Sequence, residues 1–127
     1  MSEDFKKFPL GRETYEIIGC AMEVLNELGH GYFEKPYENA MAVEFRLRGI
    51  PYKQQPPYRI LYKGENVGDY IPDLIVYGQI IVDLKVIDQI GRNEIAQMLN
   101  YLRVTKLPVG LILNFKRQEL EYKRVAL

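Results

Sequence analysis

The chain has 127 residues, of which 47% are hydrophobic and 27% are charged. A chain of this length buries one compact core, and its composition is typical of a globular protein rather than a disordered one. Its 17 basic and 17 acidic residues cancel, which excludes the strong positive field of a protein that coats nucleic acid through net charge alone. Any contact with a polyanion must therefore be local, and residues 103–127 do hold six Lys and Arg against two acids.

The N-terminal end carries no targeting signal that can be recognised in the sequence. The first nine residues contain four charged side chains and no apolar run, which indicates neither a secretory signal nor a membrane span. We expect a cytoplasmic protein with an N-terminal tail at residues 1–12 and a single domain at residues 13–127. Cys20 is the only cysteine, so we interpret it as a packing residue rather than as part of a disulfide or a metal site.

Two helices are expected in the first half of the chain. Apolar residues recur with a 3.6-residue period over residues 13–28, and Gly29 follows as a stop. A second helix is expected at residues 34–48, where Pro36 is tolerated because it falls in the first turn and Gly49 ends the helix. The residues of this second helix that should face the core are Tyr37, Ala40, Met41 and Leu47.

The rest of the chain is predicted to form five strands and one further helix. The strands are expected at residues 58–62, 67–76, 80–86, 108–114 and 120–125. Pro72 marks a break or a bulge in the second of them. Residues 92–104 form the helix, because their apolar side chains follow helical spacing. The order α, α, β, β, β, α, β, β predicts an α/β or α+β fold with helices packed on a mixed sheet.

Three charged residues interrupt the apolar segment at residues 71–85. Even-numbered positions from 74 to 86 hold only apolar side chains and the turn glycine Gly78, whereas the odd-numbered positions include Asp73, Asp83 and Lys85. A slip of one residue would mix these two faces, so the pattern favours an odd-length turn centred on Gly78. That register sets Asp73 opposite Asp83, with Cβ atoms about 5 Å apart, and like charges so placed destabilise a sheet.

The repulsion between the two aspartates must be offset by a shared proton, a nearby cation or a divalent metal. Lys85 lies one step further along the same face and can relieve part of it. A wet face at the edge of the sheet, where the lysine pairs with one aspartate, is the alternative. Against it, the same face contains Ile71, Ile75 and Ile81, which indicates that it is at least half buried. Two carboxylates with a backbone carbonyl suit a hard dication such as Mg²⁺.

These residues carry a resemblance to a known family. Pro72-Asp73, nine intervening residues and Asp83-Leu84-Lys85 resemble the signature of the PD-(D/E)XK nuclease superfamily. The segment GYFEKPY at residues 31–37 is similar to the motif that names the GxxExxY protein family, a branch of that superfamily. Residues 97–102 and 110–115 also resemble the C-terminal half of that family. The resemblance covers residues 17–125.

The resemblance implies a restriction-endonuclease-like core, with a central mixed β-sheet flanked by helices. It assigns Asp73 and Asp83 as metal ligands, with aspartate at position 83 where many relatives have glutamate. Glu34 becomes a third acidic ligand from a preceding helix, and Lys85 lies beside the attacked phosphate. The substrate-binding element corresponds to Gln97 and Tyr101, four residues apart on one helix face and predicted to point away from the apolar stripe of that helix. The implied cofactor is Mg²⁺ or Mn²⁺.

The function expected from this resemblance is metal-dependent hydrolysis of phosphodiester bonds in nucleic acid, DNA rather than RNA. Lys85 could stabilise negative charge in the transition state or help to deprotonate the attacking water, and the two carboxylates beside it favour the first role. Phosphates outside the centre would be contacted by Lys116, Arg117, Lys123 and Arg124. A homodimer would let so small a nuclease reach both strands.

The alternative is a non-catalytic module that keeps the nuclease fold to bind nucleic acid or a protein partner. The zero net charge and the short chain favour this alternative. The presence of Asp73, Asp83 and Lys85 favours the enzyme, because a decayed site has little reason to keep opposed carboxylates.

Overall fold

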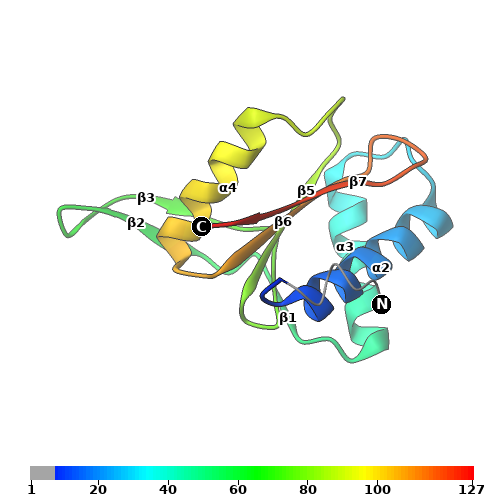
Figure 1. The fold of residues 1–127 in the computed structure, drawn as a ribbon, viewed down its shortest axis with the longest axis horizontal. Helices are drawn as coiled ribbons and strands as arrows, with labels where there is room; N and C mark the ends of the chain where they lie inside the picture. Colours follow the sequence, from blue (N-terminus) through cyan, green and yellow to red (C-terminus); the bar gives the residue numbers. More distant parts are fainter. Residues whose placement is uncertain (1–7) are drawn as a thin grey trace.

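The computed structural model describes residues 8–127, so the first seven residues of the expected tail lie outside the described part (Figure 1). Within this part the helices are α2 (Gly11–Leu28), α3 (Glu34–Arg48) and α4 (Arg92–Thr105). None of these helices is long and apolar enough to cross a membrane. The strands are β1 (Tyr52–Gln54), β2 (Tyr58–Tyr62), β3 (Glu65–Tyr70), β4 (Leu74–Val76), β5 (Ile80–Lys85), β6 (Val109–Asn114) and β7 (Glu121–Ala126).

Five of the strands form a mixed sheet in the order β1-β4-β5-β6-β7, and β2 and β3 form a separate hairpin. The β5–β6 pair is parallel, whereas β1–β4, β4–β5 and β6–β7 are antiparallel. Parallel neighbours need a long crossover, and α4 supplies it between β5 and β6. Figure 1 shows α4 on one side of the sheet and α2 and α3 on the other. The expected mixed sheet flanked by helices is confirmed.

Each face of the sheet has its own apolar core, as the alternation along residues 71–86 predicts. The even-numbered residues of β4 and β5 pack with side chains of α2 and α3. Ile75 and Ile81 pack on the other face against Met98 and Leu102 of α4. Ile71, also expected on this face, is 55% exposed because it precedes Pro72 and lies outside β4.

The buried faces of α2 and α3 differ in one respect from the expectation. Tyr37 and Met41 are fully buried, but Leu47 is 78% exposed and Phe45 lies in the core instead. Residues four apart share a helix face, so Phe45 continues the stripe of Tyr37 and Met41 while Leu47 points to the other side. The prediction for Leu47 was therefore wrong. Cys20 is fully buried in the core, as expected, and burial raises the pKa of its thiol to about 11.

The segment before the β4–β5 hairpin was predicted least well. Residues 67–76 do not form one strand: β3 ends at Tyr70, β4 begins at Leu74, and the two belong to different sheets. Pro72 lacks a backbone donor and lies between them. Strand β1 was missed, because three residues are too few to show a period.

Gly110 in β6 lies in close contact with Met98 of α4. A Cβ atom at this position would overlap the thioether of Met98, which is itself fully buried and has little room to move. We therefore expect Gly110→Ala to lower the free energy of unfolding by about 1–3 kcal/mol, measured by denaturant titration. The double variant with Met98→Ala should lose less than the sum of the two single changes. Additive losses would contradict a tight contact between α4 and β6.

Candidate active site

The β4–β5 hairpin brings Asp73 and Asp83 together. Leu74 pairs with Val82, and the turn between the two strands is centred on Gly78, which has a φ of 67°. Glycine adopts this left-handed conformation without steric cost. Continuing the register by one residue beyond Leu74 places Asp73 beside Asp83, as the alternation predicts.

The three charged side chains share one partly buried patch on the α4 side of the sheet. An oxygen of Asp73, Oδ2, accepts a hydrogen bond of 2.8 Å from the backbone N–H of Leu84. Oδ2 of Asp83 lies 3.5 Å from Nζ of Lys85, and the two side chains are 17% and 25% exposed. Each aspartate therefore has its own hydrogen-bonding or charged partner.

The carboxyl group of Asp73 resists ionisation. Its pKa is raised from 3.8 to about 7, mainly by burial; the N–H of Leu84 opposes this shift, and the hydrogen bond and charge of Asp83 add to it. A proton on Asp73 thus offsets part of the repulsion near neutral pH. A divalent cation in place of that proton would allow both carboxylates to be ionised, and carboxylate oxygens are the donors that Mg²⁺ prefers. The pair fits such an ion.

Glu34 lies at the same end of the sheet without joining the pair. Its Oε2 accepts a hydrogen bond of 3.2 Å from the N–H of Val86, directly after Lys85, and its side chain is exposed. Among residues 8–127, no three His, Cys, Asp or Glu side chains are close enough to hold one metal ion. Glu34 is therefore not part of a three-carboxylate cluster with Asp73 and Asp83.

Gln97 and Tyr101 have different environments. Gln97 is exposed on α4, whereas Tyr101 is partly buried and stacks on Tyr70 of β3, with ring centroids 3.8 Å apart. Tyr101 packs against the core on this side of the sheet, so the prediction that it points away from the apolar stripe was wrong. The pKa of Tyr70 is raised mainly by burial and next by the negative charge of Asp83. The stacked rings are therefore close enough to the aspartates to be affected by their charge.

Sequence reasoning missed Glu38, a buried carboxylate one turn after Glu34. It accepts a hydrogen bond of 3.1 Å from Nζ of Lys35 and further hydrogen bonds from the side-chain amides of Gln54 and Gln55. Its negative charge also contributes to the raised pKa of Asp73. The sequence did contain a sign of this residue's role: Glu38 falls within the apolar stripe of α3. A glutamate at such a position is expected to have hydrogen-bonding or charged partners, because glutamate is rarely buried without them.

Two of the four C-terminal cations expected to contact phosphate are engaged within the protein. Arg124 donates a hydrogen bond of 2.8 Å to the carbonyl of Pro9, and its guanidinium lies 4.9 Å from the ring centroid of Phe8. Arg117 donates to the carbonyl of Asp88. Lys116 and Lys123 are exposed, and the contact of these four cations with phosphate stays a prediction.

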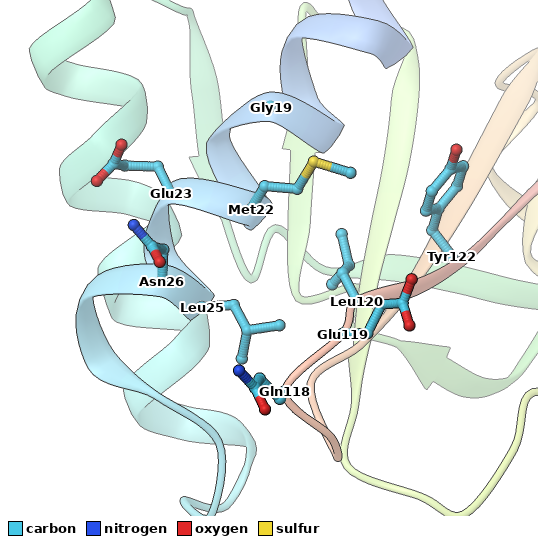
Figure 2. Close-up of a pocket in the computed structure, with 9 residues that line it drawn as sticks. All are labelled: Gly19, Met22, Glu23, Leu25, Asn26, Gln118, Glu119, Leu120 and Tyr122. Carbon is cyan, nitrogen blue, oxygen red and sulfur yellow. The ribbon is translucent and has the colours of Figure 1, made fainter.

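A cavity of about 700 Å³ lies on the other side of the sheet, between α2 and the β6–β7 connection (Figure 2). It is lined by Met22, Leu25, Leu120 and Tyr122, among others, and its charged side chains are Glu23 and Glu119. Two carboxylates without a cation repel phosphate. We therefore place the candidate site at the β4–β5 hairpin and not in this cavity.

A carboxylate pair and a lysine at one end of a mixed sheet flanked by helices are the features of a nuclease-like protein. A sequence profile of the PD-(D/E)XK nuclease superfamily matches residues 11–125, and the chain belongs to this superfamily. Its nucleases generally use divalent metal ions, and nucleic-acid binding is general among them. No curated protein and no solved structure gives a significant match to the chain.

The raised pKa of Asp73 predicts how stability depends on pH. Between pH 3.8 and about 7 the folded protein binds a proton that the unfolded chain releases. The stabilisation is complete below this window and is lost as the pH rises through about 7. In metal-free buffer, we expect the wild type to become less stable relative to Asp73→Asn over this interval, measured by denaturant titration. Parallel stability curves for the two proteins would contradict the raised pKa.

Proposed function

We propose that the protein is a metal-dependent nuclease that hydrolyses phosphodiester bonds of nucleic acid, with DNA as the expected substrate. The observation that supports this proposal most strongly is the placement of Asp73 beside Asp83 on a partly buried face, just beyond the paired residues of β4 and β5, with Nζ of Lys85 3.5 Å from Asp83. Membership of the PD-(D/E)XK nuclease superfamily supports the same reaction class.

Asp73 and Asp83 would hold Mg²⁺ or Mn²⁺ through their carboxylate oxygens. When bound, such an ion polarises the phosphodiester and lowers the pKa of a water molecule. Glu34 would contribute through a water, because Mg²⁺ keeps several waters and the carboxylate of Glu34 is already bonded to Val86. This assigns Glu34 to the outer part of the metal site.

Lys85 would act as a cation in the reaction. The carboxylate of Asp83 lies 3.5 Å from its Nζ atom, and this ion pair would hold the ammonium group beside the metal site. A fixed positive charge beside the phosphate stabilises the charge that develops in the transition state. We therefore assign Lys85 to charge stabilisation rather than to proton abstraction.

Gln97 and Tyr101 are proposed to lie on the substrate side of the site. Gln97 is exposed and can donate a hydrogen bond to the nucleic acid, whereas Tyr101 would support the substrate surface through its stack on Tyr70. Both residues are on α4, the helix that covers the face of the aspartates. We also propose a homodimer as the form that reaches both strands.

We further assign the chain to the GxxExxY branch of the superfamily. Tyr37, the last residue of that motif, donates a hydrogen bond of 2.7 Å to the carbonyl of Gly29 and accepts one of 3.2 Å from the N–H of Tyr32. Its ring stacks on Phe115. Tyr37 of the motif thus stabilises the α2–α3 connection. The glutamate of the motif, Glu34, accepts a hydrogen bond from Val86, directly after β5.

A non-catalytic binding module is the second candidate function. It is favoured by the zero net charge of the chain and by the engagement of Arg117 and Arg124 in contacts within the protein. Such a module has no need for a metal. Metal binding therefore separates the two candidates.

Calorimetric titration with Mn²⁺ tests the metal site directly. We expect one site in the wild type, no measurable binding in Asp83→Ala, and retained binding in Lys85→Ala, because the lysine is not a ligand. Glu119→Ala, which removes a carboxylate from the β6–β7 connection, serves as the matched control and should bind as the wild type does. A wild type that binds no Mn²⁺ would favour the module.

A cleavage screen over single-stranded and duplex DNA and RNA tests the activity itself. With Mg²⁺ or Mn²⁺, we expect cleavage that chelation abolishes. Loss of one charge-stabilising group typically slows a reaction about 100-fold to 1000-fold, and we expect a reduction of this order in Lys85→Ala. Equal rates in the wild type and this variant would indicate a contaminating nuclease or a different active centre.

A further inference from the structure

We propose that Glu38 is a positioning residue, which holds Asp73 in place for the metal ion by fixing Gln55. The inference rests on the proposed function, because it concerns the same metal site. It assigns a role in that site to a residue that is neither a ligand nor in contact with the substrate.

The two aspartates are anchored in different ways. Asp83 lies inside β5, which pairs with β4 on one side and with β6 on the other, so its backbone is held within the sheet. Asp73 precedes the first residue of β4 and lies beyond the paired part of that strand. Its backbone therefore needs a separate anchor if the two carboxylates are to stay side by side.

Gln55 supplies this anchor. Its N–H donates a hydrogen bond of 3.0 Å to the carbonyl of Asp73. Its φ of 54° is a left-handed conformation that is strained for a non-glycine residue and persists only where the surroundings impose it. The side chain of Gln55 is otherwise exposed, so the constraint must come from its few contacts.

Glu38 provides those contacts from α3. The side-chain amide of Gln55 lies 3.4 Å from one oxygen of Glu38 and 3.3 Å from the other, and the amide of Gln54 bonds to the same carboxylate. Gln54 pairs with Leu74, the residue after Asp73. Both glutamines thus link the buried carboxylate to the backbone at the start of β4.

The environment of Glu38 explains why a carboxylate is needed there. A buried carboxylate is costly unless it is paired and hydrogen-bonded. Lys35, its only cationic partner within residues 8–127, is 48% exposed, so this ion pair is weakened by solvent. The two glutamine amides supply the remaining hydrogen bonds. No group of three acidic side chains in the described chain can hold a metal, so Glu38 is not a ligand, and the contacts that link it to the backbone of Asp73 run through Gln55.

The experiment compares Glu38→Gln and Gln55→Ala with the wild type in Mn²⁺ titration calorimetry. A glutamine at position 38 keeps the shape of the side chain but offers one carbonyl oxygen to donors from three residues. Loss of a group that orients a metal ligand typically weakens metal binding about 10-fold to 100-fold, and we expect a loss in this range for both variants. Unchanged Mn²⁺ affinity in Glu38→Gln would overturn the inference.

Thr14→Val is the matched control for a loss of stability alone. Thr14 is a buried polar residue whose hydroxyl donates to the carbonyls of Leu10 and Gly11, at the start of α2. This variant should lose stability while retaining the Mn²⁺ affinity of the wild type. An equal loss of affinity in Thr14→Val would show that destabilisation alone explains the effect.

A second readout needs no metal. Amide hydrogen exchange of Gln55, followed by NMR in metal-free buffer, should be faster in Glu38→Gln than in the wild type and unchanged in Thr14→Val. If exchange at Gln55 does not change in Glu38→Gln, the positioning role is refuted. A wild type that binds no Mn²⁺ would refute the proposed function, and the exchange rates would then decide the role of Glu38 independently.

Discussion

The opposition of Asp73 and Asp83 across one hairpin is the constraint on which the rest of the site depends. The turn at Gly78 and the two apolar faces fix this register, and no slip of a single residue can separate the carboxylates without exposing the core. Beside the pair lie the ammonium group of Lys85 and the backbone N–H of Leu84, and the pKa of Asp73, one member of the pair, is raised to about 7. Two carboxylates so placed lower the stability of the sheet unless a proton or a cation offsets their repulsion.

The two faces of the sheet are covered differently, and this leaves the two repelling aspartates accessible at the candidate site. On one face, α2 and α3 bury the even-numbered residues of β4 and β5. On the other, α4 covers Ile75 and Ile81 but leaves the end of the sheet, where the aspartates lie, partly open. The parallel β5–β6 pair exists because α4 makes the crossover, so one helix both fixes the neighbour of β5 and borders the site.

The features that could be predicted from the sequence are those that depend on residues close together in the chain. The pairing of Asp73 with Asp83 depends on a period of two residues within fifteen, and this local pattern was sufficient. The stack of Tyr101 on Tyr70 and the bonds from Gln54 and Gln55 to Glu38 join segments 16 to 31 residues apart, and no local period encodes them. The error at Leu47 has a local cause. Leu47 is two residues from the buried Phe45, so it lies on the opposite, exposed side of α3.

Strand β1 limits how the sheet can grow. It is an edge strand of only three residues, preceded by Pro51 and followed at a short distance by Pro56 and Pro57. Proline donates no hydrogen bond, and a short edge offers few free backbone groups to another chain. This edge is therefore a poor template for intermolecular β-pairing. Aggregation by edge-to-edge addition is suppressed there, and a second copy would have to associate through side chains rather than by continuing the sheet beyond β1.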